Sequence, residues 1–416
     1  MSQTLKPYIS SPNLSNPYNK EPISFSTRVY NRPRYINQHS SNTSAFYSSK
    51  LHLDVHPNPG RGIMMVVGIG RNSTSSPMLM TELIVDTASG FTWLQGFPCD
   101  SCYKQGDFPY YNSSASKSFD PVYCTNEICQ IAPYEVHAGC SDLSQPSYEP
   151  CSYNVQYYDR TNSTGVIGTE TFYFLDASLQ GSVPVEFVPF GVGTSNYFPR
   201  QILSSPGVAG FARGYGTLLN KLGVKKFSHC FPRDEDGTGT MSFGEEAIIK
   251  GVKLALDGES ERYEALLTNL YMSGERVVVE YDYVLPANMV FDTGTSWTHL
   301  TPELVDAIVG VIKNVLRKYQ PRKWGDSELC YNMTDLSYVS LDEVAKVTFE
   351  FNYATRIDLF SFNLWLRFND INLICLGFVK GEENVFGNNL MREMNIGCTL
   401  EKDDFAMYFN RQHCLK

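Results

Sequence analysis

Two short segments of the sequence carry residues suited to acid–base chemistry. Leu83-Ile-Val-Asp86-Thr-Ala-Ser and Met289-Val-Phe-Asp292-Thr-Gly-Thr share the order apolar, apolar, apolar, Asp, Thr, small, Ser or Thr. A single Asp-Thr pair would be a weak signal, because both residue types commonly cap turns. Here the two aspartates are 206 residues apart, and a Gly-containing apolar segment follows each at a distance, at 207–211 and at 384–388. This repetition predicts an internal duplication with one site shared between the two halves.

Two carboxyl groups a few ångströms apart would share one proton, because ionising both is costly. The ionised group can take a proton from a water molecule, and the protonated group can polarise an amide carbonyl. Such a pair would hydrolyse an amide without a covalent intermediate and would work best in acid. The neighbouring residues suit this role. Thr87 and Thr293 can lock the two loops together, Ser89 and Thr295 can bond the outer carboxylate oxygens, and Gly294 completes the second loop.

The elements that must position these residues are mostly strands. Short apolar, partly β-branched runs between Gly, Asn, Ser and Pro predict strands at 63–69, 83–86, 155–158, 170–175, 185–188, 264–271, 277–281, 347–351 and 371–378. One helix is predicted, with Thr301 as its N-cap before Pro302 and with apolar residues at helical spacing as far as Val315 and Leu316. We expect a mostly β fold in two lobes, residues 56–245 and 246–416, after an N-terminal arm of residues 1–55.

Charge and hydropathy exclude several classes of partner. The 416 residues include 34 Lys+Arg and 44 Asp+Glu, for a net charge of −10, so a nucleic-acid partner is not expected. No stretch approaches the roughly 18 apolar residues of a membrane span, so we expect no membrane partner. We also expect a monomer. Residues 1–53 hold six basic residues and one acidic residue. This basic arm either docks on the acidic body by charge or is a solvated tail.

Cysteine usage indicates an oxidising compartment. The eleven cysteines are Cys99, Cys102, Cys124, Cys129, Cys140, Cys151, Cys230, Cys330, Cys375, Cys398 and Cys414. Cys99-x-x-Cys102 has the spacing of a half zinc site, but no second CxxC or HxxxH follows, so disulfides are favoured and no metal is expected. Six N-x-S/T sequons also fit a secreted protein: Asn13, Asn42, Asn72, Asn112, Asn162 and Asn332. The N-terminus shows no signal peptide. Either the protein stays in the cytosol with reduced thiols, or the natural start lies upstream, and we favour the second.

From about Gly60 to Cys414 the sequence resembles pepsin-like aspartic peptidases, and within them the plant nepenthesin-type branch. The shared landmarks are Asp86-Thr-Ala-Ser with Trp93-Leu-Gln, Pro98-Cys99-Asp-Ser-Cys102, Cys151-Ser-Tyr-Asn-Val-Gln-Tyr157-Tyr-Asp159, Phe227-Ser-His-Cys230, Asp292-Thr-Gly-Thr, Ile374-Cys375-Leu and Val385-Phe-Gly387-Asn388.

The resemblance implies a bilobal pepsin-like fold with the active-site cleft between two β lobes. Asp86 and Asp292 would be the catalytic pair of an endopeptidase that needs no cofactor and acts on polypeptides. Tyr157 would be the tyrosine of a flap that closes over substrate, hydrogen-bonded toward Trp93. Residues 10–34 look like the remains of a prosegment, as in a zymogen. The implied disulfides are Cys330 with Cys375 and Cys230 with Cys414.

Three departures from the family pattern bear on activity. Ala88 stands where Gly is usual, which is costly only if the position requires a positive φ. Tyr158 and Arg160 replace glycines of the flap tip, so the shape of that turn is open. Cysteines expected near Gly96 and Val192 are absent, while Cys398 is extra.

Two functions therefore remain: an acid-active endopeptidase, and a non-catalytic relative that binds a protein or peptide in its cleft, as an inhibitor or receptor-like protein. The motifs of nucleophilic hydrolases (G-x-S-x-G) and of zinc peptidases (H-E-x-x-H) do not occur in the sequence.

Overall fold

The structure of the chain is a computed structural model. It describes residues 25–31, 62–72, 76–130, 133, 136–140, 148–175, 182–199, 205–233, 237–279, 284–344 and 346–414. The predicted strands lie within these ranges except for residues 280–281. Of the N-terminal arm, only residues 25–31 are described.

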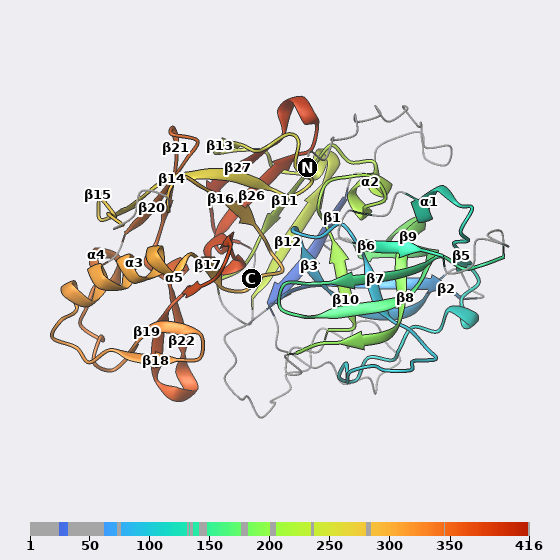
Figure 1. The fold of residues 1–416 in the computed structure, drawn as a ribbon, viewed down its shortest axis with the longest axis horizontal. Helices are drawn as coiled ribbons and strands as arrows, with labels where there is room; N and C mark the ends of the chain where they lie inside the picture. Colours follow the sequence, from blue (N-terminus) through green and yellow to red (C-terminus); the bar gives the residue numbers. More distant parts are fainter. Residues whose placement is uncertain are drawn as a thin grey trace, which may run out of the picture.

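The largest sheet of the described residues has 15 strands and contains strands from both halves of the chain (Figure 1). Its strands from the N-terminal half are β1 (Phe25–Asn31), β2 (Ile63–Arg71), β3 (Pro77–Asp86), β4 (Trp93–Gln95), β5 (Asp120–Pro121), β6 (Val136–Gly139), β7 (Ser152–Gln156), β8 (Asn162–Leu175), β9 (Ser182–Tyr197), β10 (Gly207–Gly210), β11 (Lys226–Cys230) and β12 (Thr238–Phe243). The C-terminal half adds β13 (Val252–Ala255), β26 (Met394–Thr399) and β27 (Ala406–Arg411). The order is β13-β27-β26-β11-β12-β1-β2-β3-β10-β4-β9-β8-β7-β6, with β5 beside β8.

Two smaller sheets build the rest of the C-terminal half, drawn mostly in orange on the left of Figure 1. The eight-stranded sheet contains β14 (Glu264–Met272), β15 (Glu275–Arg276), β16 (Ala287–Phe291), β17 (Thr298–Leu300), β20 (Val347–Phe351), β21 (Thr355–Leu359), β24 (Phe378–Lys380) and β25 (Asn384–Phe386). The four-stranded sheet contains β18 (Arg322–Trp324), β19 (Ser327–Asn332), β22 (Trp365–Phe368) and β23 (Leu373–Leu376). The helices are α1 (Glu127–Gln130), α2 (Leu218–Leu222), α3 (Pro302–Val315), α4 (Leu341–Val344) and α5 (Ser361–Leu364). The expected bilobal, mostly β fold is confirmed.

The predicted helix is confirmed, with two corrections of detail. Helix α3 begins at Pro302 and buries Leu304, Ile308 and Ile312 on one face, as the spacing predicts. Thr301 is at the N-cap position, but its side chain makes no capping hydrogen bond. Val315, the last residue of the helix, is 53% exposed, whereas Leu316 after it is buried. No helix of the described residues combines the length and hydrophobicity needed to cross a bilayer.

Three strand predictions need correction. The strand predicted at 155–158 ends at Gln156, because Tyr157 begins the turn of a hairpin. The strand predicted at 277–281 is absent from its described residues, 277–279, which follow the short strand β15 and form no strand of their own, although Val277 N donates to the Leu270 carbonyl of β14 (2.8 Å). The run predicted at 371–378 is divided into a 3-10 turn that ends at Ile371 and the separate strands β23 and β24.

The described part of the basic arm is a strand. β1 lies between β12 and β2 in the large sheet, with Phe25 opposite Phe243 and Asn31 opposite Ile63. Backbone pairing on both sides therefore holds this segment, which is neither a solvated tail nor a segment docked by charge alone.

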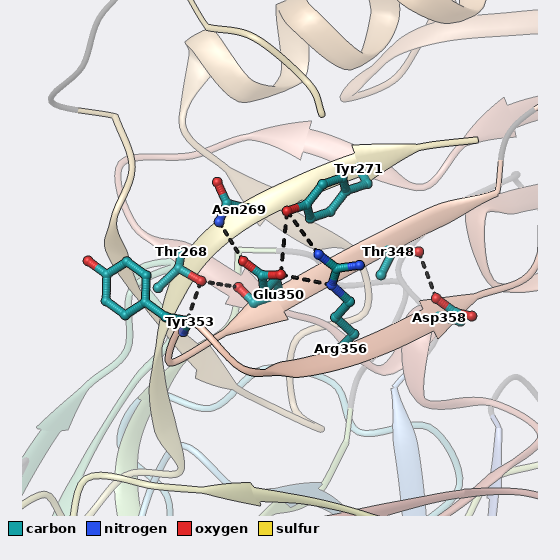
Figure 2. A network of polar contacts seen from close by, with 8 residues as sticks. All are labelled: Thr268, Asn269, Tyr271, Thr348, Glu350, Tyr353, Arg356 and Asp358. Carbon is teal, nitrogen blue, oxygen red and sulfur yellow. Dashed lines mark hydrogen bonds and ion pairs between the residues drawn. The ribbon is translucent and has the colours of Figure 1, made fainter. Parts of the chain in front are cut away.

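A polar network ties together three strands of the eight-stranded sheet (Figure 2). The carboxylate of Glu350, on β20, accepts hydrogen bonds from Asn269 Nδ2 (2.5 Å), Tyr271 OH (3.4 Å) and Arg356 Nε (2.8 Å). The Arg356 guanidinium also lies 4.6 Å from the centre of the Tyr271 ring. These hydrogen bonds, the one from Arg356 foremost, lower the pKa of Glu350. The network connects β14, β20 and β21 and lies outside the cavity described below.

Candidate active site

The two aspartates lie at the ends of strands in the same structural context. β3 ends at Asp86, and β16 ends one residue before Asp292. Each strand has a parallel neighbour, β10 for β3 and β25 for β16. These neighbours are the Gly-containing apolar segments noted in the sequence. The Asp86 carbonyl accepts a hydrogen bond from Phe211 N (2.7 Å), and Asp292 N donates to the Phe386 carbonyl (3.1 Å).

Thr87 and Thr293 lock the two loops by reciprocal hydrogen bonds. Thr87 Oγ1 donates to the Phe291 carbonyl (2.9 Å), and Thr293 Oγ1 donates to the Val85 carbonyl (2.7 Å). Each hydroxyl oxygen also accepts from the backbone N–H of the other threonine, at 3.0 Å for Thr87 Oγ1 and 3.2 Å for Thr293 Oγ1. Both side chains are buried. Because every group has a partner on the opposite loop, the two aspartates are held in fixed relative positions.

Each carboxylate is held by donors of its own loop. Asp86 Oδ1 accepts from Ala88 N (2.8 Å) and Ser89 N (3.1 Å), and Asp86 Oδ2 accepts from Ser89 Oγ (2.8 Å). Asp292 Oδ1 accepts from Gly294 N (2.7 Å), and its Oδ2 accepts from the hydroxyl of Thr295 (2.5 Å). The sequence-predicted residues of both loops are therefore brought together in one site.

The carboxyl groups of Asp86 and Asp292 meet beside Gly294. A Cβ placed on Gly294 would lie 2.9 Å from Asp86 Cγ and 3.2 Å from Asp292 Oδ1. Both aspartates are buried, with 7% and 8% of their surfaces exposed. Burial, followed by the negative charge of Asp292, raises the pKa of Asp86 well above its ordinary value. Because a second negative charge beside the first is costly, the arrangement favours a state in which the two carboxyl groups share one proton.

Ala88 keeps the geometry of its loop despite its extra methyl group. Its φ lies outside the positive range, so an L-residue meets no backbone strain at this position. Its N–H bonds Asp86 Oδ1 at nearly the distance found for Gly294 N and Asp292 Oδ1. The backbone cost that a positive φ would impose is therefore absent. Ala88 lines the cavity beside the aspartates.

Tyr157 lies at the start of the turn between β7 and β8, and its hydroxyl accepts a hydrogen bond from Trp93 Nε1 (2.9 Å). The turn closes without glycine. Arg160 N donates to the Tyr157 carbonyl (3.0 Å), and Arg160 takes the left-handed conformation, with a φ of 72°. For a non-glycine residue this conformation costs about 1 kcal/mol. The flap tip thus has a regular turn, with Arg160 in a conformation that glycine adopts more easily.

The aspartates open into a cavity of about 490 Å³, lined by residues from both halves of the chain. Its apolar lining is Met64, Ile84, Phe198, Val208, Val290, Trp297 and Val385. A volume of this size accommodates several residues of an extended peptide or a comparable ligand. The site offers carboxylates for proton transfer and apolar walls for side chains.

The cavity also has a polar wall that the sequence did not predict. Arg262, His299 and Glu383 line it, and Glu382 is next to it along the chain. They come from separate strands or loops of the C-terminal half, and no local motif joins them. Only the fold brings them to the aspartates.

Five disulfides form in the described residues: Cys99–Cys102, Cys124–Cys140, Cys129–Cys151, Cys230–Cys414 and Cys330–Cys375. The last two are the pairs that the resemblance implied. The thiols of the CxxC segment and of the nearby sulfur cluster are all used in disulfides, which leaves them no free thiolate for zinc. Cys398 is a free, buried thiol whose pKa is raised by burial.

At the two positions where family cysteines are absent, Gly96 and Val192, side-chain packing fills the space. Gly96 and Val192 are close neighbours, since a Cβ on Gly96 would lie 2.4 Å from Val192 Cγ1. The valine side chain therefore occupies the space that a second side chain at position 96 would need. Packing replaces a cross-link at this point.

Comparison with known proteins places the chain in a family. Models described as xylanase inhibitor N-terminal and xylanase inhibitor C-terminal match residues 64–245 and 262–407. An aspartyl protease family protein of Arabidopsis thaliana is 29% identical over 348 residues, 78% of this chain and 67% of the relative. Aspartyl protease UND of the same plant is 25% identical over 388 residues, 90% of this chain and 91% of the relative. Aspartic proteinase nepenthesin-1 of Nepenthes gracilis is 33% identical over 160 residues, 38% of this chain and 32% of the relative.

Solved structures agree at the level of the fold. Basic 7S globulin from soybean superposes with a TM-score of 0.65 at 15% identity, over 94% of this chain and 95% of the globulin. Conglutin gamma from lupine seeds gives the same TM-score and identity over 94% and 96% of the two chains. Together with the family matches, the fold and the paired Asp-Thr loops show that the chain belongs to the pepsin-like family of plant aspartic proteases.

Proposed function

We propose that the protein is an aspartic endopeptidase that hydrolyses polypeptides in acid. One observation carries the proposal: two buried carboxyl groups, Asp86 and Asp292, meet beside one cavity, and burial together with the charge of Asp292 raises the pKa of Asp86. The reciprocal threonine bonds fix their separation, and Tyr157 of the flap turn lines the same cavity. We take residues 56–245 and 246–416 as the two lobes that supply the aspartates.

The chemistry follows from the shared proton. The ionised Asp292 takes a proton from a water molecule, whose oxygen attacks the carbonyl carbon of the peptide bond. Asp86 gives its proton to the carbonyl oxygen, so the product of this step is a neutral gem-diol. Asp292 then passes its proton to the amide nitrogen as the C–N bond breaks, and Asp86 recovers a proton from a hydroxyl of the diol. No metal ion or covalent intermediate enters this sequence.

The shared proton also determines how activity depends on pH. Asp86 must be protonated and Asp292 ionised, so activity falls as the pH rises through the raised pKa of Asp86 and falls again when both groups are protonated. We further propose that the protein is secreted through an oxidising compartment. Residues 1–55 would be its prosegment, and the active form would be a monomer. The five disulfides support the compartment.

A second candidate is a protein that binds a polypeptide in this cleft without cutting it. Two observations favour it: the methyl group of Ala88 lines the cavity beside the aspartates, and the matching family models are described as xylanase inhibitor segments. In this case the cavity walls would bind a segment of the partner, and the aspartates would only line its floor.

The test is cleavage of an unfolded protein at pH 3–6. The chain would be expressed through a secretory route and acidified, and would be assayed with and without pepstatin beside Asp292→Ala. Cleavage that pepstatin inhibits and that Asp292→Ala abolishes supports the peptidase. A folded, processed protein that does not cleave, even as Ala88→Gly, would leave the binding protein as the better account.

A further inference from the structure

Two neighbouring tyrosines of the flap tip are bound to opposite halves of the molecule. Tyr157 is bonded to Trp93, in the N-terminal half. Tyr158 extends the other way, and its hydroxyl donates to Glu382 Oε2 at 3.0 Å, a contact between residues 224 positions apart. Glu382 lies between β24 and β25, in the C-terminal half.

The flap tip is stiff enough to couple these contacts. Tyr157 N donates to the Thr161 carbonyl (2.8 Å), in addition to the bond from Arg160 N to the Tyr157 carbonyl. The two carboxylate oxygens of Asp159 accept from Thr161 N (2.8 Å) and Thr161 Oγ1 (2.9 Å). Because these bonds fix the turn internally, the flap tip moves as one unit, and a restraint on Tyr158 also restrains Tyr157.

The other end of the contact is anchored in the C-terminal half. Glu383, which follows Glu382, accepts from Arg262 Nη1 at 3.1 Å. The same guanidinium bonds Glu264, on β14, through Nη2 at 3.3 Å. Glu382 therefore extends from a segment that ion pairs hold against a strand of the eight-stranded sheet.

The contact also connects lining segments from the two halves of the chain. Tyr158 and Asp159, from the N-terminal half, and Arg262 and Glu383, from the C-terminal half, line the same cavity as the aspartates. The Tyr158–Glu382 bond thus bridges these two segments. An extended chain that enters between them must break this bond or pass beside it.

We propose that Tyr158 and Glu382 form a latch that holds the flap closed over the cleft and limits the entry of polypeptides. This inference rests on the proposed function, because it requires that a polypeptide binds in the cleft. Opening must precede binding, so the apparent affinity is reduced by the fraction of molecules that are closed. Tyr158 is 70% exposed, and a single exposed hydrogen bond of this kind changes such an equilibrium by about three- to ten-fold.

The first test is the association rate of pepstatin, used as a peptide probe that is not cleaved. Tyr158→Phe keeps the ring but removes the donor, and Glu382→Ala removes the acceptor. Each is expected to raise the association rate, and to lower KM for a polypeptide substrate, by about three- to ten-fold. The double variant should gain nothing further, because both changes break the same bond.

Glu382→Gln is the matched control, because its amide oxygen still accepts from the Tyr158 hydroxyl. Its association rate should stay close to that of the unmodified protein. Rates that do not change in Tyr158→Phe and Glu382→Ala, or single effects that add in the double variant, would overturn the latch.

A second measurement needs neither cleavage nor ligand binding. In the ligand-free protein, Tyr158→Lys places an amine near the Glu382 carboxylate, and a carbodiimide should join the two in an amide that mass spectrometry maps to 158–382. The variant Tyr158→Lys/Glu382→Gln should not form this link. A missing link in Tyr158→Lys would contradict a closed flap. Failure of the peptidase proposal would instead appear as a link formed by a protein that does not cleave.

Discussion

The two aspartate loops share their strand context and their threonine bonds, and they differ most at their third residue. In the second loop a Cβ on Gly294 would lie 2.9 Å from Asp86 Cγ, so there is no space for a side chain. The first loop has Ala88 at this position, with an ordinary φ and the same type of N–H bond to its aspartate. The repeated motif therefore determines the backbone conformation of both loops, while the groups that face the third residue determine which side chain fits there.

The largest effect should come from the aspartates themselves. Asp86→Asn and Asp292→Asn each remove one titratable member of the pair, and each should reduce kcat/KM by about 10³- to 10⁴-fold. Asp370→Asn, at an exposed position away from the cavity, is the control and should retain full activity. If only one of the two loop variants lost activity, the loops would not act as a pair.

Buried His229 should make the folded protein less stable at low pH, which limits the pH range in which the two loops can be compared. Its ring is buried on β11, stacks on Phe231 at 4.3 Å, and has a pKa lowered to about 3 by burial. An unfolded chain binds a proton to this group below about pH 6.5, whereas the folded chain does not until about pH 3. The free energy of unfolding should therefore fall by about 3 to 5 kcal/mol as the pH drops from 6.5 to 3.

His229→Phe keeps an aromatic ring but cannot be protonated, and it should lose this part of the pH dependence. The measurement is denaturant unfolding at pH 7 and pH 4. His137→Gln, at an exposed histidine, should behave as the unmodified protein does. An unchanged pH dependence in His229→Phe would contradict the assignment.

Substitutions at the third residue of each loop test whether Gly294 and Ala88 lie in different surroundings. Gly294→Ala forces a methyl group against Asp86 and should reduce kcat/KM by about 10²-fold, because a displacement of about 1 Å is enough for such a loss. Ala88→Gly should change kcat/KM by less than about three-fold, since the Ala88 backbone is unstrained. A gain of 10²-fold in Ala88→Gly would show instead that the methyl impairs the natural site.

The threonines test the symmetry of the connection between the loops. Thr87→Val and Thr293→Val each remove one hydrogen bond to a buried carbonyl and one from a buried N–H. Each should lower the free energy of unfolding by about 2 to 4 kcal/mol. Thr→Ser at the same positions keeps the hydroxyl and should cost much less. Losses that differ by several-fold between the two valine variants would show that the loops are not equivalent.

The smallest effects should be shifts in the pH profile. Ser89 donates to Asp86 and lowers the pKa of that carboxyl group, so Ser89→Ala should raise it further and move the basic limb to higher pH. Thr295→Val removes the matching donor of Asp292 and should leave the basic limb in place. The shift in Ser89→Ala should be about one pH unit or less. A basic limb that moves in Thr295→Val alone would reverse the assignment of the proton.

Much of this site could be predicted from sequence because its motifs are local. The Asp-Thr loops, the strand that ends at Asp86 and helix α3 follow from patterns within a few residues of each other, whereas β16, before Asp292, was not among the predicted strands. The flap turn was less predictable, since Arg160 takes a conformation that its residue type disfavours. The Tyr158–Glu382 contact, and the position of Val192 above Gly96, depend on residues far apart in the chain, so no spacing rule indicates them.

The most direct test of the account is the pH profile of kcat/KM for one peptide, measured with the unmodified protein from pH 2 to pH 8. A pair that shares one proton predicts a bell-shaped curve with its maximum in acid and a fall toward neutral pH as Asp86 loses its proton. A rate that rises to neutral pH, or no cleavage at any pH by the folded protein, would contradict the account.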